Sequence, residues 1–202
     1  MHTGWRCDRC GGVEPLHVVG GISAEVVAAA AHRAGGGGLP LWCPWPLLMG
    51  WTVTGVAWAG DDRMGRRATA LALSGPAPLS DGPADIVFVA EGLGVGLGNC
   101  LAGLDGTDPG GLLRAATRNL APHAKVKAAG HPTPLWAVDS GADRSAYVGE
   151  ARGLWLFAIA WPAQAGYLLA EDIHLHDLTE SVPSELIFGA PSARLRPAPP
   201  KE

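Results

Sequence analysis

The sequence has little lysine and little charge of either sign. Only three of its 15 basic residues are lysines, 17% of the 202 residues are charged, and the formal net charge is −4. A protein that binds nucleic acid usually concentrates positive charge on one surface. The composition therefore argues against a nucleic-acid partner.

Signals for export and for membrane insertion are also missing. No segment combines a basic start, an apolar core and a small-residue cleavage site. One apolar stretch, residues 154–170, carries no charge over 17 residues, which is the lower limit for crossing a bilayer. Pro162 and Gly166 interrupt that stretch, so it reads as two buried strands with a turn between them. We therefore expect a cytoplasmic protein with no membrane partner.

Cysteine is scarce, with four residues at positions 7, 10, 43 and 100. In a reducing compartment such thiols are free or bound to metal. The segment from Cys7 to Cys10, followed by glycine, has the spacing of a zinc knuckle. Structural zinc needs four ligands, and no spacing rule selects His2, His17 or Cys43 as the others. Two alternatives stay open, a zinc site that uses Cys7 and Cys10 or an unpaired pair of thiols.

The order of helices and strands predicts one β-rich domain. Ser23 is a suitable N-cap for a helix over 24–34, which the glycines at 35–38 end. A proline-broken, extended lead-in over 39–51 follows, and leucine spacing predicts a glycine-weakened helix over 93–104. We expect a surface loop over 105–121. Strand-like runs lie at 51–59, 67–74, 86–90, 124–129, 134–138, 144–149, 153–161, 165–170 and 173–178.

These runs are short and are separated by turn residues, which favours an antiparallel meander over βαβ units. The runs 51–59 and 67–74 should pair, as should 144–149 and 153–161. The predicted fold class is α+β, a mostly antiparallel sheet with one or two short helices and an N-terminal cysteine-bearing stub. We expect a stub over 1–17, the domain over 18–190 and a disordered tail over 191–202.

The richest concentration of charge lies in the loop of the first predicted hairpin. Two carboxylates and three guanidiniums occur within seven residues, at Asp61, Asp62, Arg63, Arg66 and Arg67. Such a set can clamp an anion or host an acid/base pair. The alternative is a charged hairpin turn, since aspartate and glycine are favoured in turns.

Two further patterns have weaker support. Glycines at 92, 94, 96 and 98 follow a strand-like run, but they match neither the dinucleotide fingerprint nor the P-loop. Asp172, His174 and His176 share one face of a strand, so a metal site is one interpretation and solvent-facing residues are the other.

Several long strings resemble an uncharacterised family from GC-rich Gram-positive bacteria. They are LPLWCPWPLLMGWTVTGVAWAGDDRMGRRATALALSGPAPL, VFVAEGLGVGLGNCLAGLDGTDPG, HPTPLWAVD and GEARGLWLFAIAWPAQAGYLLAEDI. The family is known as a domain of unknown function, and some members carry an automatic label as phosphotransacetylase. The resemblance implies an N-terminal zinc-ribbon-like segment, with a Cys-x-x-Cys-Gly element upstream of Trp-x-Cys-Asp-x-His-Gly. Here WRCDRCGG places Cys10 where the family has histidine, and the upstream pair is missing.

Neither the residues nor the resemblance identifies a reaction. We expect a non-catalytic binding or interaction module of the bacterial cytoplasm, with an unknown protein or small-molecule partner. The alternative is an acyl or phosphate-transfer enzyme that acts on acetyl phosphate and coenzyme A. Zinc is the one cofactor that the sequence suggests.

The departure at the N-terminus leads to a test of the zinc site. We expect a chain extended in frame upstream of Met1 to carry a second Cys-x-x-Cys and about one zinc ion, because four thiolates complete a tetrahedral site. The chain as printed should carry none. Metal analysis of both purified forms measures this. Stoichiometric zinc in the printed form would contradict the expectation and point to His17 or Cys43 as further ligands.

Overall fold

The computed structural model describes residues 6–7, 11–12, 16–61, 65–77, 81–119 and 121–195. The strands are β1 (Arg6–Cys7), β2 (Gly11–Gly12), β3 (Leu16–Val18), β4 (Trp42–Pro44), β5 (Thr52–Asp61), β6 (Gly65–Pro76), β7 (Pro83–Glu91), β8 (Ala124–Ala128), β9 (His131–Val138), β10 (Ser145–Ala151), β11 (Leu154–Trp161) and β12 (Ile173–Asp177). The helices are α1 (Ala24–Gly35), α2 (Leu97–Ala102), α3 (Gly110–Asn119) and the 3₁₀ helices η1 (Ala163–Ala170) and η2 (Ala193–Leu195).

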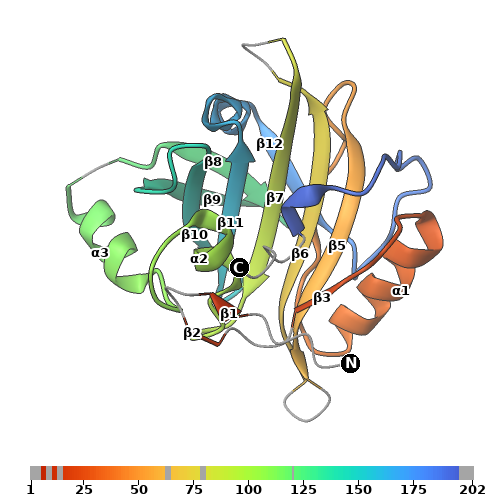
Figure 1. Cartoon of the computed structure of the whole chain (residues 1–202), viewed down its shortest axis with the longest axis horizontal. Helices are drawn as coiled ribbons and strands as arrows, with labels where there is room; N and C mark the ends of the chain where they lie inside the picture. Colours follow the sequence, from red (N-terminus) through yellow and green to blue (C-terminus); the bar gives the residue numbers. More distant parts are fainter. Residues whose placement is uncertain are drawn as a thin grey trace, which may run out of the picture.

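Ten strands form one sheet in the order β3-β5-β6-β7-β11-β10-β9-β8-β12-β4 (Figure 1), and β1 pairs with β2 in a separate small sheet. Every neighbouring pair in the large sheet is antiparallel except β8 and β12, which are parallel. The prediction of an α+β fold built on a mostly antiparallel sheet is confirmed.

Both predicted hairpins form. In the first, β5 pairs with β6 from Thr52 opposite Ser74 to Asp61 opposite Gly65. In the second, β10 and β11 are joined by the two-residue turn Arg152–Gly153, whose φ angles are 55° and 76°. Two successive positive φ angles are typical of the type I′ turn, whose twist matches that of the strands it joins.

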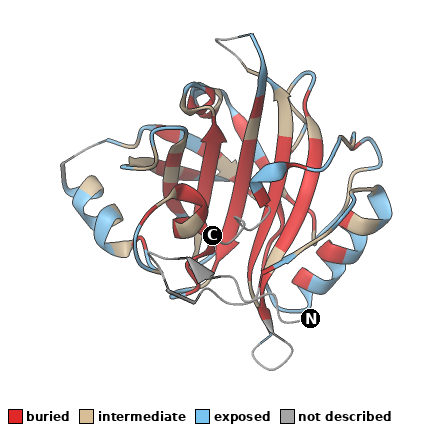
Figure 2. Cartoon of the chain, viewed as in Figure 1, coloured by how far each residue is buried: buried red, intermediate tan, exposed pale blue. Residues whose placement is uncertain are grey.

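The two faces of the central strands bury different side chains. On β7, Ile86 and Phe88 belong to one hydrophobic cluster, together with β4 and α1. Val87 and Val89 point the opposite way and pack in a second cluster with α2. Buried residues accordingly run along the middle of the sheet, while much of α3 is exposed (Figure 2). The run over 154–160, expected to be the most buried, has half-buried residues at its start, and Ile86–Glu91 is buried throughout.

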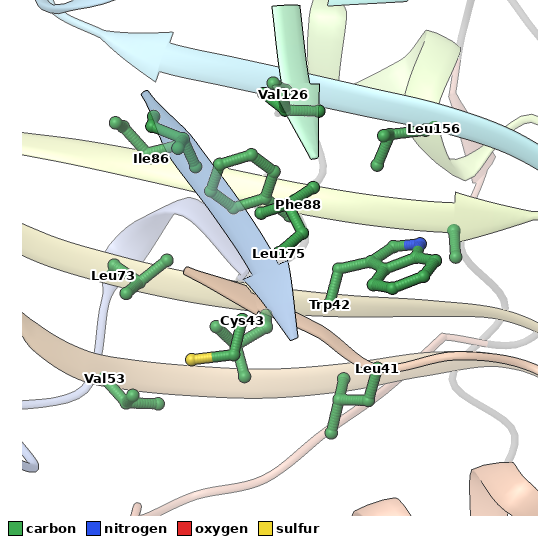
Figure 3. Close-up of a cluster of buried hydrophobic side chains, with 14 of the residues drawn as sticks. Leu41, Trp42, Cys43, Val53, Leu73, Ile86, Phe88, Val126, Leu156 and Leu175 are labelled. Carbon is green, nitrogen blue, oxygen red and sulfur yellow. The ribbon is translucent and has the colours of Figure 1, made fainter. Parts of the chain in front are cut away.

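Strand β4 makes the sheet roll up on itself. It pairs with β12 at one end of the sheet and also packs against β6 and β7, near the other end. Its residues Trp42 and Cys43 thereby insert among the side chains of Ile86, Phe88 and Leu73 (Figure 3). The prediction of an irregular lead-in over 39–51 missed this strand, because three residues between prolines carry no strand periodicity.

The helix α1 forms where the sequence predicts it. Ser23 lies in extended backbone, and its Oγ accepts a hydrogen bond from the Val26 N–H at 3.3 Å. Val27, Ala30, Ala31 and Ala34 are the buried residues of its inner face. Three of these four are alanines, so the face that α1 buries consists mainly of small side chains.

Two predictions for the second half of the chain are wrong. The expected loop over 105–121 contains α3, whose first turn closes with a hydrogen bond from the Leu113 N–H to the Pro109 carbonyl. The expected strand over 165–170 belongs to η1, which starts with the Ala165 N–H bonded to the Pro162 carbonyl. Two glycines at the start of α3 made this helix hard to predict from the sequence. The η1 segment is rich in alanine and lacks the β-branched residues that favour a strand. The described residues therefore include three α-helices rather than one or two.

The expected stub and tail both meet the sheet. β3 runs through residue 17 and pairs with β5. After residue 191, the Ser192 N–H bonds to the Thr54 carbonyl, Arg194 pairs with Asp85 at 3.0 Å, and Leu195 is buried. Residues 192–195 of the expected tail therefore contact the sheet. In the part of the chain that the structure describes, no helix is long and apolar enough to span a membrane.

A buried carboxylate connects the rolled end of the sheet, formed by β12 and β4, to the β10–β11 hairpin. The side chain of Asp177, at the end of β12, is 2% exposed and pairs with Arg152 at 2.7 Å. Its other oxygen accepts hydrogen bonds from the Leu41 N–H and from the N–H and hydroxyl of Thr179. The Arg152 guanidinium lies 5.4 Å from the ring of Trp42. One carboxylate therefore connects β12, the segment that enters β4 and the β10–β11 turn.

Replacing this carboxylate should weaken the fold markedly. We expect Asp177→Ala to lower the free energy of unfolding by about 3 kcal/mol, because the buried Leu41 N–H and the part-buried Thr179 N–H lose their acceptor and Arg152 loses a partner. Urea unfolding measures the change. The matched control is Asp172→Ala, which removes an exposed ion pair with Lys127 and should cost less than about 1 kcal/mol. Equal losses for the two variants would show that the Asp177 network does not hold the roll together.

Candidate functional site

The predicted anion-binding residues lie at the tip of the first hairpin. Asp62 and Arg63 and the side chain of Asp61 lie outside the described residues. Arg66 and Arg67 begin β6 and are both half-buried. Of the predicted cluster, the structure therefore describes the side chains of Arg66 and Arg67 only.

A β-bulge separates these two arginines. Ala59 lies opposite Ala68, whereas Gly60 lies opposite Arg66, so Arg67 is the extra residue. A bulge changes which side chain points to a given face. Arg66 consequently lies with Trp58, and its guanidinium is 5.0 Å from that ring. Arg67 donates from Nη2 to the carbonyl of Leu93 at 2.7 Å. The two arginines therefore do not form one clamp.

Arg66 instead lines a cavity of about 440 Å³ with residues from three other elements. His17 comes from β3, Trp58 from β5 and Arg33 from the last turn of α1. The remaining lining residues are glycines, at positions 36, 37, 60 and 65. We refer to this space as the basic cavity.

Aromatic contacts position His17 and Arg66 in the basic cavity. His17 lies opposite Trp58 in the pairing of β3 with β5, and the two rings stack with centroids 5.5 Å apart and planes 14° apart. On the neighbouring strand, Arg66 makes its cation–π contact with the same indole. Trp58 therefore orders both side chains at the mouth of the hairpin.

Gly60 allows the hairpin to close beside the cavity. Its φ angle is 138°, a conformation that residues with a side chain rarely adopt. A Cβ there would also collide with the carbonyl of Gly65 and lie 2.8 Å from the Arg66 Cα. The glycine is therefore part of what places Arg66 next to Trp58.

The charge of the basic cavity is opposite to that of the whole chain. Among the described residues that line it, two are arginines and none carries a carboxylate. Arg33 makes no hydrogen bond or ion pair with any residue that the structure describes. Guanidinium groups bind phosphate and carboxylate oxygens through paired N–H donors. The arrangement can therefore hold a small anion.

The zinc hypothesis stays a prediction, because the structure describes only the backbone around Cys7. Cys7 lies opposite Gly11 in the pairing of β1 with β2, but its side chain and all of Cys10 lie outside the described residues. The other candidate ligands have different environments. His17 stacks on Trp58, and Cys43 is buried in the core, where desolvation raises the pKa of its thiol to about 12.

The strand with two histidines does not assemble a metal site. The Nε2 of His174 lies 3.2 Å from the Oδ2 of Asp172, and both side chains contact the Nζ of Lys127. His176 instead hydrogen-bonds through Nε2 with the carbonyl and hydroxyl of Ser181. Within the described ranges, no group of three or more histidine, cysteine, aspartate or glutamate residues could hold a metal ion.

The glycine-rich segment after β7 surrounds a buried acid instead of a phosphate. Glu91 is fully buried, and its Oε2 accepts a hydrogen bond from the Gly98 N–H at 2.9 Å. Its other oxygen makes no hydrogen bond with the residues that the structure describes. Burial raises the pKa of this carboxyl to about 8, although the backbone N–H groups of Gly98 and Leu97 act to lower it.

Sequence reasoning found Arg66 but missed His17, Arg33 and Trp58. These three residues lie on three elements that meet only when β3 pairs with β5 and α1 packs nearby. Trp58 carried a weak signal, since it lies on a predicted strand next to the charged hairpin loop. His17 and Arg33 carried none.

Comparisons with known proteins give one match. Residues 1–195 match the model of a family of unknown function, DUF6758. No curated protein and no solved structure matches the chain.

The buried acid predicts how stability depends on pH. Between the ordinary pKa of 4.5 and the folded value of about 8, the unfolded chain loses a proton that folded Glu91 keeps. Stability should therefore fall as the pH rises through this window, by up to about 5 kcal/mol in total. Glu91→Gln should remove this loss and be more stable than the wild type at pH 8.

Urea midpoints between pH 5 and pH 9 measure the effect. Glu150→Gln, which changes an exposed glutamate of β10, serves as the control and should follow the wild type. A constant difference between Glu91→Gln and the wild type across this range would contradict the prediction.

Proposed function

The chain thus belongs to this family of unknown function, and we propose that it is a non-catalytic binding module of the bacterial cytoplasm. Its basic cavity holds an anionic small molecule. The observation that supports this proposal is the convergence of Arg33 and Arg66 with His17 and Trp58 in one cavity whose described lining has no carboxylate.

The size and lining of the cavity favour a small ligand over a protein surface. A volume of about 440 Å³ lies within the range of small-molecule sites. Phosphate and carboxylate groups match the two guanidiniums, and the indole and imidazole offer apolar surface beside the charge. Asp61, Asp62 and Arg63 stay in the proposed site on the sequence pattern alone, because their side chains lie outside the described residues. Arg67 is left out because it bonds to Leu93.

The position of Arg33 depends on the Asp177 network. Thr179 donates to Asp177, and a Cβ on Gly35 would lie 3.3 Å from the Thr179 Cβ. The C-terminal turn of α1, which carries Arg33, therefore rests against this buried network. A rigid support of this kind keeps the cation in place before a ligand arrives, which lowers the entropic cost of binding.

A thermal-shift titration tests the proposed function. A ligand that binds the native state raises the melting temperature as its concentration rises. We expect this for at least one of inorganic phosphate, acetyl phosphate, ADP and coenzyme A. Arg33→Glu should abolish the rise, because it places a carboxylate against the anion. Arg118→Glu makes the same charge change on the exposed face of α3 and is the matched control.

The outcomes separate the two functional hypotheses. No shift with any of these anions, or equal shifts in the wild type and Arg33→Glu, would contradict an anion site in the basic cavity. Consumption of acetyl phosphate and coenzyme A, lost in Arg33→Glu, would contradict the non-catalytic part and support acyl transfer.

A further inference from the structure

A second cavity lies between η1 and the strands β8 and β10. Its volume is about 440 Å³. Three rings line it, those of His123, Tyr147 and Tyr167, and the rest of the lining is small, at Ala124, Ala163, Gly166 and Ala170. It shares no lining residue with the basic cavity. We call it the tyrosine cavity, because the chain has only two tyrosines and both line it.

The backbone fixes the proton of His123. Its Nδ1 accepts a hydrogen bond from the Ala137 N–H of β9 at 3.2 Å. A backbone N–H can only donate, so the neutral ring carries its hydrogen on Nε2. The residue itself is anchored by a hydrogen bond from its N–H to the Leu135 carbonyl. His123 therefore offers a donor at a defined position in the lining of the cavity.

Two hydroxyl groups meet at the wall formed by Gly166. A Cβ on this glycine would collide with the Ser145 Oγ and lie 2.8 Å from the Tyr147 Oη. Ser145 and Tyr147 are two residues apart on β10, so they point to the same face of the strand. The buried Ser145 Oγ makes no hydrogen bond with any residue that the structure describes. Hydroxyl oxygens thus gather next to apolar methyl groups and rings.

The described lining of the tyrosine cavity has no carboxylate, ammonium or guanidinium group. Tyr167 is 67% exposed, although large aromatic side chains are usually well buried. An exposed ring at the edge of a cavity is a platform on which a ligand can stack. The cavity therefore suits a neutral ligand that has an apolar face and polar edges.

We propose that the tyrosine cavity binds a neutral sugar ring. The C–H face of a pyranose stacks on the exposed Tyr167 ring, and its hydroxyl groups pair with His123 Nε2–H and the Tyr147 hydroxyl. A purely aromatic ligand would bury these polar groups without partners, which is costly. An anion would find no cation in the described lining. The site is separate from the basic cavity, so it does not depend on the anion-binding proposal.

Ligand-observed NMR and calorimetry with methyl glucoside and methyl N-acetylglucosaminide test the proposal. We expect at least one to bind the wild-type chain. Tyr167→Ala should weaken binding at least about fivefold, because the platform is lost. Tyr147→Phe removes only a hydroxyl group and should weaken binding by about fivefold, the equivalent of one hydrogen bond. Ile187→Ala, which trims another exposed apolar side chain, should bind like the wild type.

Melting curves of the variants provide the folding control, and both tyrosine variants should melt close to the wild type because Tyr167 is exposed and Tyr147→Phe keeps the ring. Failure of both sugars to bind at millimolar concentration would overturn the proposal. Equal binding by the wild type and Tyr167→Ala, or binding of phenol in place of the sugars, would overturn it as well.

Discussion

The buried carboxylate of Asp177 is the contact on which the rolled shape of the sheet depends. A carboxylate removed from water needs donors on all sides, so β12, the segment entering β4 and the β10–β11 turn must meet at one point. Arg152 adopts a positive φ there, which costs an L-residue about 1 kcal/mol. Its ion pair with Asp177 and its contact with Trp42 offset that cost. Through Thr179 the same network supports the end of α1 and hence the basic cavity.

Local turn chemistry explains which parts of the fold were predictable. Both hairpins, α1 and a short helix after β7 follow from glycines, caps and alternation within about 25 residues of each other. The parallel pairing of β8 with β12 and the inward position of β4 were not predictable, because both depend on contacts between distant segments. Helix α3 was missed because its apolar periodicity extends over only a short segment and because the helix begins with two glycines.

In the candidate site, too, features of the local sequence were predictable and contacts between distant segments were not. The sequence placed Arg66 and Arg67 together in one predicted anion-binding cluster, since both belong to the charged hairpin loop. The single extra residue in β6 shifts the register so that Arg66 lies opposite Gly60, on the same face as Trp58, and a bulge leaves no signal in the composition of a strand. The partners that Arg66 does meet come from β3, β5 and α1. A site assembled across a sheet is visible only when the strand register is known.

The ends of the sheet decide how another protein can approach it. The two terminal strands, β3 and β4, have three residues each, and β4 faces the interior. Along β5 beyond β3, the N–H and carbonyl of Val53 are already bonded to Ile187 and Gly189. Exposed strand edges are where sheets join other chains, in peptide capture as in aggregation. The edge strands of this sheet are short or face the interior, so assembly by strand addition is disfavoured. Partners are then recognised by the cavities and loops of the protein.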